Sequence, residues 1–266
     1  MFPVLFQIGS IDVYTYGVMV AVGILIGLWY ARHQARVLGL DPARVWNLGV
    51  YMVLAAFVAA KLWMIAADFG YYREHPGDLF SLATLQSGGT FYGGVIGALL
   101  VAALYSWFAK LPLLTLLDSY SAGLPLGHAI GRLGCYAAGC CWGKPTSLPW
   151  GVQFSSLEAA RLVGTPIGST LHPTQLYESS AEFMNFVILI WLARRQNFRG
   201  ELFAMFLLLY GFERGIIEFF RGDPDRTLFF GGAFSLMQVV SVCMILLGAW
   251  LWRTRANRPV LAPAES

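Results

Sequence analysis

The sequence of 266 residues contains little charge: only 12% of its residues are Asp, Glu, Lys or Arg, whereas 57% are hydrophobic. An ordinary soluble domain carries roughly 25% charged residues. This scarcity argues against a water-soluble protein, and apolar stretches long enough to cross about 30 Å of hydrocarbon recur along the chain. The net charge of +3 does not predict nucleic-acid binding. We expect a polytopic helical protein in a lipid bilayer.

Cysteine and histidine are also scarce, with four residues of each. Zinc sites usually combine two pairs of closely spaced ligands, and Cys135, Cys140 and Cys141 lack a second pair, so we expect no metal ion. Cys135 could form a disulfide with one of its neighbours on an oxidising outer side, or the three could be small buried side chains. A catalytic thiol activated by Arg132 is the less favoured alternative. The stretch QSGGTFYGGVIG lacks the lysine of a phosphate-binding loop, which argues against a nucleotide cofactor.

Hydrophobic segments of membrane-spanning length occur seven times, and no Lys or Arg precedes the first, which argues against a removable signal peptide. The fourth segment is interrupted by Asp118, Pro125 and glycines. Inside a membrane, such an interrupted backbone occurs only where it contacts protein or a water-filled cavity. We therefore predict an all-α fold with one membrane domain over residues 1–255 and a short cytoplasmic tail over residues 256–266. The expected spans are about Val13–Tyr30, Val45–Ala67, Thr90–Phe108, Leu113–Cys135, Thr174–Leu192, Glu201–Phe220 and Ala233–Trp252.

Lys and Arg residues between these spans predict the orientation, because positive charge is enriched in cytoplasmic loops. With seven spans, ten cations fall on one side and five on the other, which places the N-terminus outside and the C-terminus in the cytoplasm. Lys61, Arg132 and Arg214 remain within spans. A charge at mid-membrane costs at least about 2.5–3.5 kcal/mol, so each should face a partner or a wet cavity. Lys61 either pairs with a carboxylate such as Asp118 or extends toward the interface.

The segment LLLYGFERGIIEFFRGD carries four polar residues at helical spacing, namely Tyr210, Arg214, Glu218 and Arg221. The guanidinium of Arg214 offers a planar fork of donors that suits phosphate, while Glu218 would hold it in place and Tyr210 would add a hydroxyl. We favour this anion-binding interpretation over a salt-bridge cluster that only fixes helix packing. Arg221 could instead extend to the outer interface.

Arg132 lies in the glycine-rich stretch GHAIGRLGC. Gly127, Gly131 and Gly134 leave room for another backbone or a lipid head group to approach it. His128 lies one turn earlier on the same face. We expect His128 to be a hydrogen-bonded interior residue rather than a catalytic one.

The stretch STLHPTQLYE predicts a helix that begins near Pro173, since proline suits the first helical turn. Gln175, Tyr177 and Glu178 follow just inside this turn, where backbone amides attract anions. Glu178 is either the partner of a buried arginine or an ordinary first-turn carboxylate. The pattern leaves both alternatives open.

Several motifs, in this order, resemble the bacterial prolipoprotein diacylglyceryl transferase family: TYG, FYGGVIG, GRLG followed by WGK, HPTQLYE and YGFERGIIEFFR. Together they extend over most of the chain. The resemblance implies seven helices in the bacterial cytoplasmic membrane and transfer of the diacylglyceryl group of phosphatidylglycerol to the lipobox cysteine of a prolipoprotein, with release of glycerol phosphate. It implies phosphatidylglycerol and prolipoprotein signal peptides as partners, and this chemistry requires no cofactor.

The resemblance also assigns roles to individual residues. Arg132 and Arg214 match the two essential arginines of the family, with Glu218 and Tyr210 beside the second, so these four are the expected catalytic residues. We expect the arginines to neutralise the departing phosphate oxygen while the substrate thiolate attacks the adjacent glycerol carbon. The expected substrate-binding residues are Arg132, Gly143, Tyr16, Tyr92, Gly93, Gly94, His172, Gln175, Glu178 and Arg221.

The chain departs from the family pattern at four positions. Cys135, Ala138 and Cys140 stand where the family signature usually has Asn, Asn and Glu, and Tyr92 stands where many members have a histidine. We expect a cysteine-bearing branch of the family in which another group promotes thiolate formation. The alternative is a catalytically inactive lipid-binding or transport relative with an arginine-lined cavity. A membrane thiol oxidoreductase is a weaker alternative, because no C-x-x-C motif is present.

Overall fold

The computed structural model describes residues 2–9, 11–81, 84, 89–224, 227–229 and 234–256. The expected tail beyond Ala256, and two of the cations used to predict orientation, Arg226 and Arg258, lie outside these residues. The chain forms two compact units, Met1–Gln34 with Leu117–Ser266, and Ala35–Leu116. It passes from one unit to the other within helices α1 and α6.

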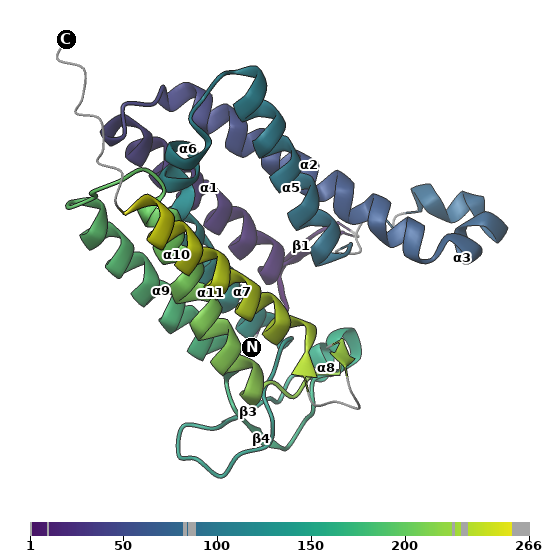
Figure 1. The fold of residues 1–266 in the computed structure, drawn as a ribbon. Helices are drawn as coiled ribbons and strands as arrows, with labels where there is room; N and C mark the ends of the chain where they lie inside the picture. The colour runs from purple at the N-terminus through teal and green to yellow at the C-terminus, as the bar shows by residue number, and fades with distance from the viewer. Residues whose placement is uncertain are drawn as a thin grey trace. The chain divides into compact units, whose positions relative to one another are not determined.

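The larger unit is mainly helical (Figure 1). Its helices are α1 (Thr15–Val37), α6 (Leu113–Ser121), α7 (Gly123–Ala138), α8 (Leu157–Val163), α9 (Thr174–Ala193), α10 (Glu201–Ile217), the 3-10 helix η2 (Glu218–Phe220) and α11 (Leu236–Arg255).

In the described residues, three short two-stranded antiparallel sheets accompany the helices, which an all-α expectation does not include. They pair β1 (Val4–Ile8) with β2 (Ile11–Tyr14), β3 (Val152–Gln153) with β4 (Thr170–Leu171), and β5 (Leu228–Phe229) with β6 (Phe234–Ser235). In the β3–β4 sheet, whose strands are joined through α8, Val152 is opposite Leu171. β4 is followed closely by α9.

Local sequence signals explain where several helices begin and end. Pro173 caps the start of α9, close to the expected position. Gly139 ends α7 in the left-handed conformation with a φ of 83°, which suits a residue without a side chain. Ser235 and Gln238 form a capping box at the start of α11. The fourth expected span is interrupted as predicted, because α6 and α7 are separate helices on either side of Ala122.

Glycine contacts bring α1 and α7 close together within the larger unit. A Cβ atom added to Gly23 would lie 2.5 Å from the carbonyl oxygen of Gly127, and one added to Gly27 would lie 2.8 Å from that of Gly123. Helix backbones approach this closely only where small residues face each other. α7 also packs against α9, α9 against α10 and α10 against α11 (Figure 1).

Asp118 of α6 is fully buried and acts as a backbone anchor. Its carboxylate accepts hydrogen bonds from the backbone N–H groups of Gly200 (2.6 Å) and Phe203 (2.9 Å) and from Gln196 Nε2 (2.7 Å). These donors lie at or near the start of α10, so Asp118 satisfies amides that the first helical turn leaves unpaired. Lys61, in the other unit, donates a hydrogen bond to the carbonyl oxygen of Thr84 (2.5 Å).

The smaller unit consists of α2 (Pro42–Ala67), α3 (Phe69–Glu74), η1 (Pro76–Phe80) and α5 (Phe91–Phe108), with α2 packed against α5. A Cβ atom at Gly93 would lie 2.7 Å from the Ala59 carbonyl oxygen, and one at Gly97 would lie 2.5 Å from Ala59 Cβ. Gly94 faces Ala56 at ordinary contact distance. These glycines therefore allow α2 and α5 to pack closely.

Helices cover most of the described part of each expected membrane span. Three of them, α1, α2 and α11, are long and apolar enough to cross a membrane alone, while Tyr92–Phe108 is a shorter apolar helix. Large apolar side chains point outward, including Phe57 (59% exposed) and Leu246 (64% exposed). Such exposed apolar surface is typical of lipid-facing helices. Seven crossings and one domain over residues 1–255 remain predictions.

Candidate functional site

The first element of the site is a buried ion pair between α7 and α9. Arg132 Nη2 contacts Glu178 Oε2, and the two residues are 8% and 2% exposed. Burying either charge alone would be costly, so each requires the other. Of the two alternatives that the sequence left open, Glu178 is thus the partner of a buried arginine.

A polar network extends from this pair. Glu178 Oε1 lies 3.6 Å from His128 Nε2, and His128 Nδ1 is hydrogen-bonded to Glu182 Oε1. Asn185 Nδ2 donates to Glu182 Oε2 (3.5 Å) and to Glu213 Oε2 (2.5 Å). The network therefore joins α7, α9 and α10, and the hydrogen-bonded role expected for His128 is confirmed.

Three members of this network were not predicted from the sequence, namely Glu182, Asn185 and Glu213. The signal was present, because Glu178, Glu182 and Asn185 are spaced by four and three residues and thus occupy one face of an apolar helix. Glu213 immediately precedes Arg214, and its side chain points elsewhere on the helix. Its partner Asn185 could not be identified from spacing alone.

The second element is the pair formed by Arg214 and Glu218 at the end of α10. Arg214 Nη1 lies 2.7 Å from Glu218 Oε2, and both residues are buried. Tyr210 lies one turn earlier, and its ring centroid is 5.9 Å from that of His128. The prediction that Tyr210, Arg214 and Glu218 are neighbours is therefore consistent with the helix. Tyr210 contacts His128 and so links this helix to the network around Glu178.

Arg221 does not continue this helix face. α10 ends at Ile217, η2 follows, and Arg221 is extended with φ −66° and ψ 137°. Its guanidinium binds both carboxylate oxygens of Asp223 at 2.6 Å, and it is 7% exposed. The helical spacing therefore does not continue to Arg221. Its side chain is buried and paired with Asp223 and does not reach toward an outer interface.

Gly143 lies at a crossing of two backbone segments. Its N–H donates to the carbonyl oxygen of His172 (3.0 Å), and it forms an antiparallel bridge with Arg221. A Cβ atom here would lie 2.5 Å from the His172 carbonyl oxygen and 2.9 Å from that of Phe220. Only glycine fits, so Gly143 fixes the position of Arg221 relative to the start of α9.

The turn after α7 is held by the first residues of α9. Gln175 Nε2 donates to the carbonyl oxygen of Cys140 (2.6 Å), and Thr174 Oγ1 donates to that of Cys141 (2.7 Å). Cys141 has a φ of 61°, which is uncommon for a residue with a side chain. The two hydrogen bonds help to maintain this conformation.

Three cysteine side chains meet at this turn. The sulfur atoms of Cys135, Cys140 and Cys141 all lie within 4.8 Å of one another, and Arg132 Nη1 lies 3.7 Å from Cys135 Sγ. All four cysteines of the chain are free thiols, so the disulfide that the sequence left open as one alternative is not formed. The departures from the family signature at Cys135 and Cys140 are thus adjacent to the expected catalytic Arg132.

The electrostatic surroundings of Cys141, in the loop after α7, favour its thiolate. The neighbouring sulfurs of Cys135 and Cys140, and then the positive charges of Arg132 and Arg221, hold the pKa of the Cys141 thiol below its ordinary value. The same hydrogen-bonded sulfurs raise the pKa of the Cys140 thiol, so the cluster favours a thiolate at Cys141 rather than at Cys140.

The remaining expected residues come from α1 and α5. Tyr16 of α1 packs beside α7, because a Cβ atom at Gly134 would lie 3.3 Å from Tyr16 Cα, and it interacts electrostatically with the three cysteines and Arg132 although its side chain is 45% exposed. Tyr92, Gly93 and Gly94 belong to α5 in the smaller unit. Their part in substrate binding remains a prediction.

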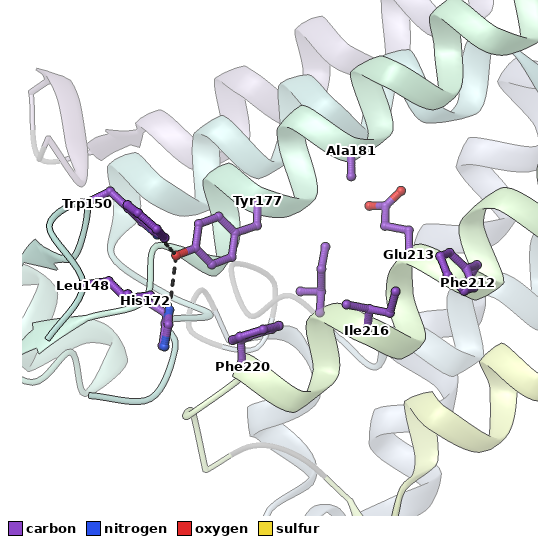
Figure 2. A pocket seen from close by; sticks show the side chains of 10 residues that line it. Leu148, Trp150, His172, Tyr177, Ala181, Phe212, Glu213, Ile216 and Phe220 are labelled. Carbon is purple, nitrogen blue, oxygen red and sulfur yellow. Dashed lines mark hydrogen bonds between the residues drawn. The ribbon is translucent and has the colours of Figure 1, made fainter. Parts of the chain in front are cut away.

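An apolar groove of about 630 Å³ lies beside the network (Figure 2). Tyr177 accepts a hydrogen bond from Trp150 Nε1 (2.7 Å) and lies 3.2 Å from His172 Nδ1, while Glu213 supplies a carboxylate among apolar side chains. The groove is lined by Leu148, Trp150, His172, Tyr177, Ala181, Phe212, Glu213, Ile216, Ile217 and Phe220.

Some buried polar atoms of the centre have no hydrogen-bond partner within the part of the chain that the structure describes. They include the donor Arg132 Nε and the acceptors Gln175 Oε1 and Glu213 Oε1. Buried polar atoms are usually paired, so such exceptions are candidates for contacts with a ligand. The centre thus offers fixed positive charge with a free donor next to an apolar groove.

Comparison with known proteins identifies the family of the chain. The sequence profile of the family described as prolipoprotein diacylglyceryl transferase matches residues 3–254. Proteins named phosphatidylglycerol–prolipoprotein diacylglyceryl transferase are similar in Clostridium tetani (32% identity; 95% of this chain and 97% of that protein) and in Thermosynechococcus vestitus (31% identity; 92% and 89%). The protein of this name in Brucella anthropi is 30% identical over 96% of this chain and 92% of its own length. The chain therefore belongs to the prolipoprotein diacylglyceryl transferase family.

Proposed function

We propose that this chain transfers the diacylglyceryl group of phosphatidylglycerol to the lipobox cysteine thiol of a prolipoprotein and releases glycerol phosphate. The observation that carries the proposal is the pair of buried arginines, Arg132 and Arg214, each held by a buried glutamate. A phosphodiester with apolar tails requires such positive charge next to apolar surface. The family membership supplies the substrate class.

In the proposed reaction the substrate thiolate attacks the glycerol carbon next to the phosphate. A C–S bond forms, the C–O bond breaks, and the departing phosphate oxygen keeps the electron pair. Arg132 and Arg214 stabilise this growing negative charge in a site of low polarity, where fixed donors are most effective. Glu178 and Glu218 orient the guanidinium groups, and Arg132 Nε is available to a phosphate oxygen.

The groove between α9 and α10 suits an acyl chain of the lipid. Its lining includes the apolar side chains of Phe212 and Ile216 and also Glu213, which Asn185 joins to the network around Glu178. A lipid whose phosphate lies near Arg214 could therefore place a tail along this surface. Apolar contacts would then hold the lipid while polar groups orient the phosphate.

We also propose the finer topology: seven membrane crossings in the bacterial cytoplasmic membrane, with the N-terminus outside and the C-terminus in the cytoplasm. The distribution of Lys and Arg supports this orientation. The cysteine cluster and Arg132 would then face the outer side, where a prolipoprotein signal peptide exposes its lipobox cysteine. Cysteine accessibility to an impermeant maleimide at engineered loop positions tests this topology.

The second candidate is a lipid-binding or transport relative without transfer activity, and the observation behind it is Tyr92, at a position where the resemblance implies a histidine in many members. The two candidates differ in product formation. The purified chain is incubated with phosphatidylglycerol and a lipobox peptide with one cysteine, and the peptide mass is measured. Transfer predicts a gain of one diacylglyceryl group, which is lost in Arg132→Ala and Arg214→Ala.

The matched control for these variants is Arg161→Ala, because Arg161 is an exposed arginine of α8. The proposal is supported if Arg161→Ala still transfers the diacylglyceryl group while Arg132→Ala and Arg214→Ala do not. Undiminished transfer by folded Arg132→Ala or Arg214→Ala would contradict the catalytic assignment. No transfer by the folded, lipid-bound wild-type chain would favour the second candidate.

A further inference from the structure

The cysteine cluster has the dimensions of a metal site. A tetrahedral zinc ion with Zn–S bonds of about 2.3 Å places its sulfur ligands roughly 3.8 Å apart. The three sulfurs of Cys135, Cys140 and Cys141 lie within 4.8 Å of one another, so small rotations of the side chains suffice to reach this spacing. Spacing along the sequence did not predict a site, because only two cysteines are adjacent and no second ligand pair exists.

The backbone around the cluster is fixed from several sides. Cys135 projects from α7, whereas Cys140 and Cys141 come from the following turn. Three hydrogen bonds hold that turn: Gln175 and Thr174 donate to the carbonyls of Cys140 and Cys141, and Thr165 Oγ1 donates to that of Gly139 (2.8 Å). Fixed ligands of this kind favour metal binding, because little ordering is needed when the ion arrives.

The charges near the cluster fit a bound zinc ion. Three thiolates and Zn²⁺ carry one net negative charge, which requires compensation in a site of low polarity. Arg132 Nη1 lies 3.7 Å from Cys135 Sγ, and Arg221 interacts electrostatically with Cys141. These positive charges would stabilise the complex.

The cluster leaves one coordination position for another ligand. The group of potential ligands found in the described residues contains three cysteines and no fourth Cys, His, Asp or Glu. Cys135 is buried, whereas Cys140 and Cys141 are partly exposed. Zinc sites with three protein ligands and one open position bind water or substrate there.

We propose that Cys135, Cys140 and Cys141 bind one zinc ion, and that the thiol of the substrate peptide occupies its fourth position as a thiolate. The second part rests on the proposed function. Binding to zinc releases the thiol proton to solvent. The zinc-bound sulfur then forms the C–S bond with the glycerol carbon, and glycerol phosphate leaves with the electrons of the broken C–O bond. Zinc would thus promote formation of the thiolate that attacks the lipid.

The metal site is tested first, independently of activity. The full chain is purified in detergent with a phosphine reductant, and its zinc content is measured by mass spectrometry. We expect about one zinc per chain, lost in Cys135→Ser, Cys140→Ser and Cys141→Ser and retained in the matched control Cys243→Ser, whose cysteine is exposed and outside the cluster. A folded wild-type chain that retains no zinc and takes up none on titration overturns the site.

Cobalt substitution keeps the proposal testable if a serine variant does not fold. Co²⁺ added to the metal-free wild-type chain should give the visible absorption of tetrahedral cobalt with thiolate ligands, and Zn²⁺ should displace it. A lipobox peptide should shift this absorption, while the same peptide with serine instead of cysteine should not. No cobalt–thiolate absorption, or a disulfide within the cluster in protein isolated without reductant, would overturn the site.

Transfer assays then separate the two proposals. Loss of transfer on chelation, restored by zinc, supports thiol coordination. Full transfer by the metal-free chain overturns the role of zinc but leaves the transferase function intact. One bound zinc without transfer of lipid to any lipobox peptide supports the metal site and contradicts the proposed function.

Discussion

Glu178 of α9 forms an ion pair with Arg132 of α7, although the two residues are 46 positions apart in the sequence. This pair links the expected catalytic arginine to a buried network. We predict that Glu178→Gln leaves the Arg132 charge uncompensated and lowers the free energy of unfolding by about 3–5 kcal/mol. Thermal melting in detergent measures this change. Transfer activity should fall as well, because the guanidinium is no longer oriented.

The double variant Arg132→Met with Glu178→Leu separates stability from catalysis. Removing both charges should recover most of the melting temperature, since buried ion pairs can often be replaced by apolar residues at little cost. It should not recover transfer. A melting temperature of Glu178→Gln equal to that of the wild type would show that the pair is not energetically important.

Much of this site could be predicted from the sequence, because hydrocarbon makes buried charge conspicuous. Arg132 and Arg214 stand out in apolar segments, and the i, i+4 spacing of Arg214 and Glu218 predicts the contact that the structure contains. The partner of Arg132 could not be chosen from spacing, since the contact depends on how α7 packs against α9. Family resemblance supplied the substrate, which charge alone could not name.

Other features depend on backbone geometry that the pattern did not reveal. The helical spacing that included Arg221 failed because α10 ends at Ile217 and the chain becomes extended four residues later. Similarly, the cysteines meet because Cys141 adopts a positive φ after Gly139. Neither the end of the helix nor this left-handed residue has a strong sequence signal.

Arg214 is predicted to require its planar guanidinium and not only its charge. In Arg214→Lys the ammonium keeps the charge but cannot provide two parallel donors to a phosphate. Loss of one such donor reduces kcat by roughly 10²–10³-fold where transition-state charge is stabilised. Steady-state transfer with the lipobox peptide measures kcat and KM separately. Arg161→Lys in α8 is the matched control. Equal kcat values for the wild type and Arg214→Lys would show that the planar guanidinium of Arg214 is not required.

Gly23 is predicted to be needed for the contact between α1 and α7. A Cβ atom at Gly23 would lie 2.5 Å from the Gly127 carbonyl oxygen, whereas nothing lies within 4 Å of a Cβ atom at Gly17 of the same helix. Gly23→Ala should therefore destabilise the protein by roughly 1–3 kcal/mol through overpacking. Gly17→Ala should be neutral or slightly stabilising, since alanine favours helix. Thermal melting of both variants measures these effects. Similar melting temperatures of Gly23→Ala and Gly17→Ala would contradict the close contact of α1 and α7 at Gly23.

The groove beside α9 is predicted to hold an acyl chain, so reducing its volume should change lipid selection. Ala181 lines the groove, and Ala181→Phe would place a ring inside it. Transfer from phosphatidylglycerol with long acyl chains should then show a higher KM, while short-chain lipid should be affected less. The control Met184→Phe adds bulk to an exposed position on the same helix that does not line the groove. Because the ring would displace a tail rather than the phosphate, kcat at saturating short-chain lipid should remain close to that of the wild type. An unchanged KM for every chain length would place the acyl chains elsewhere on the protein.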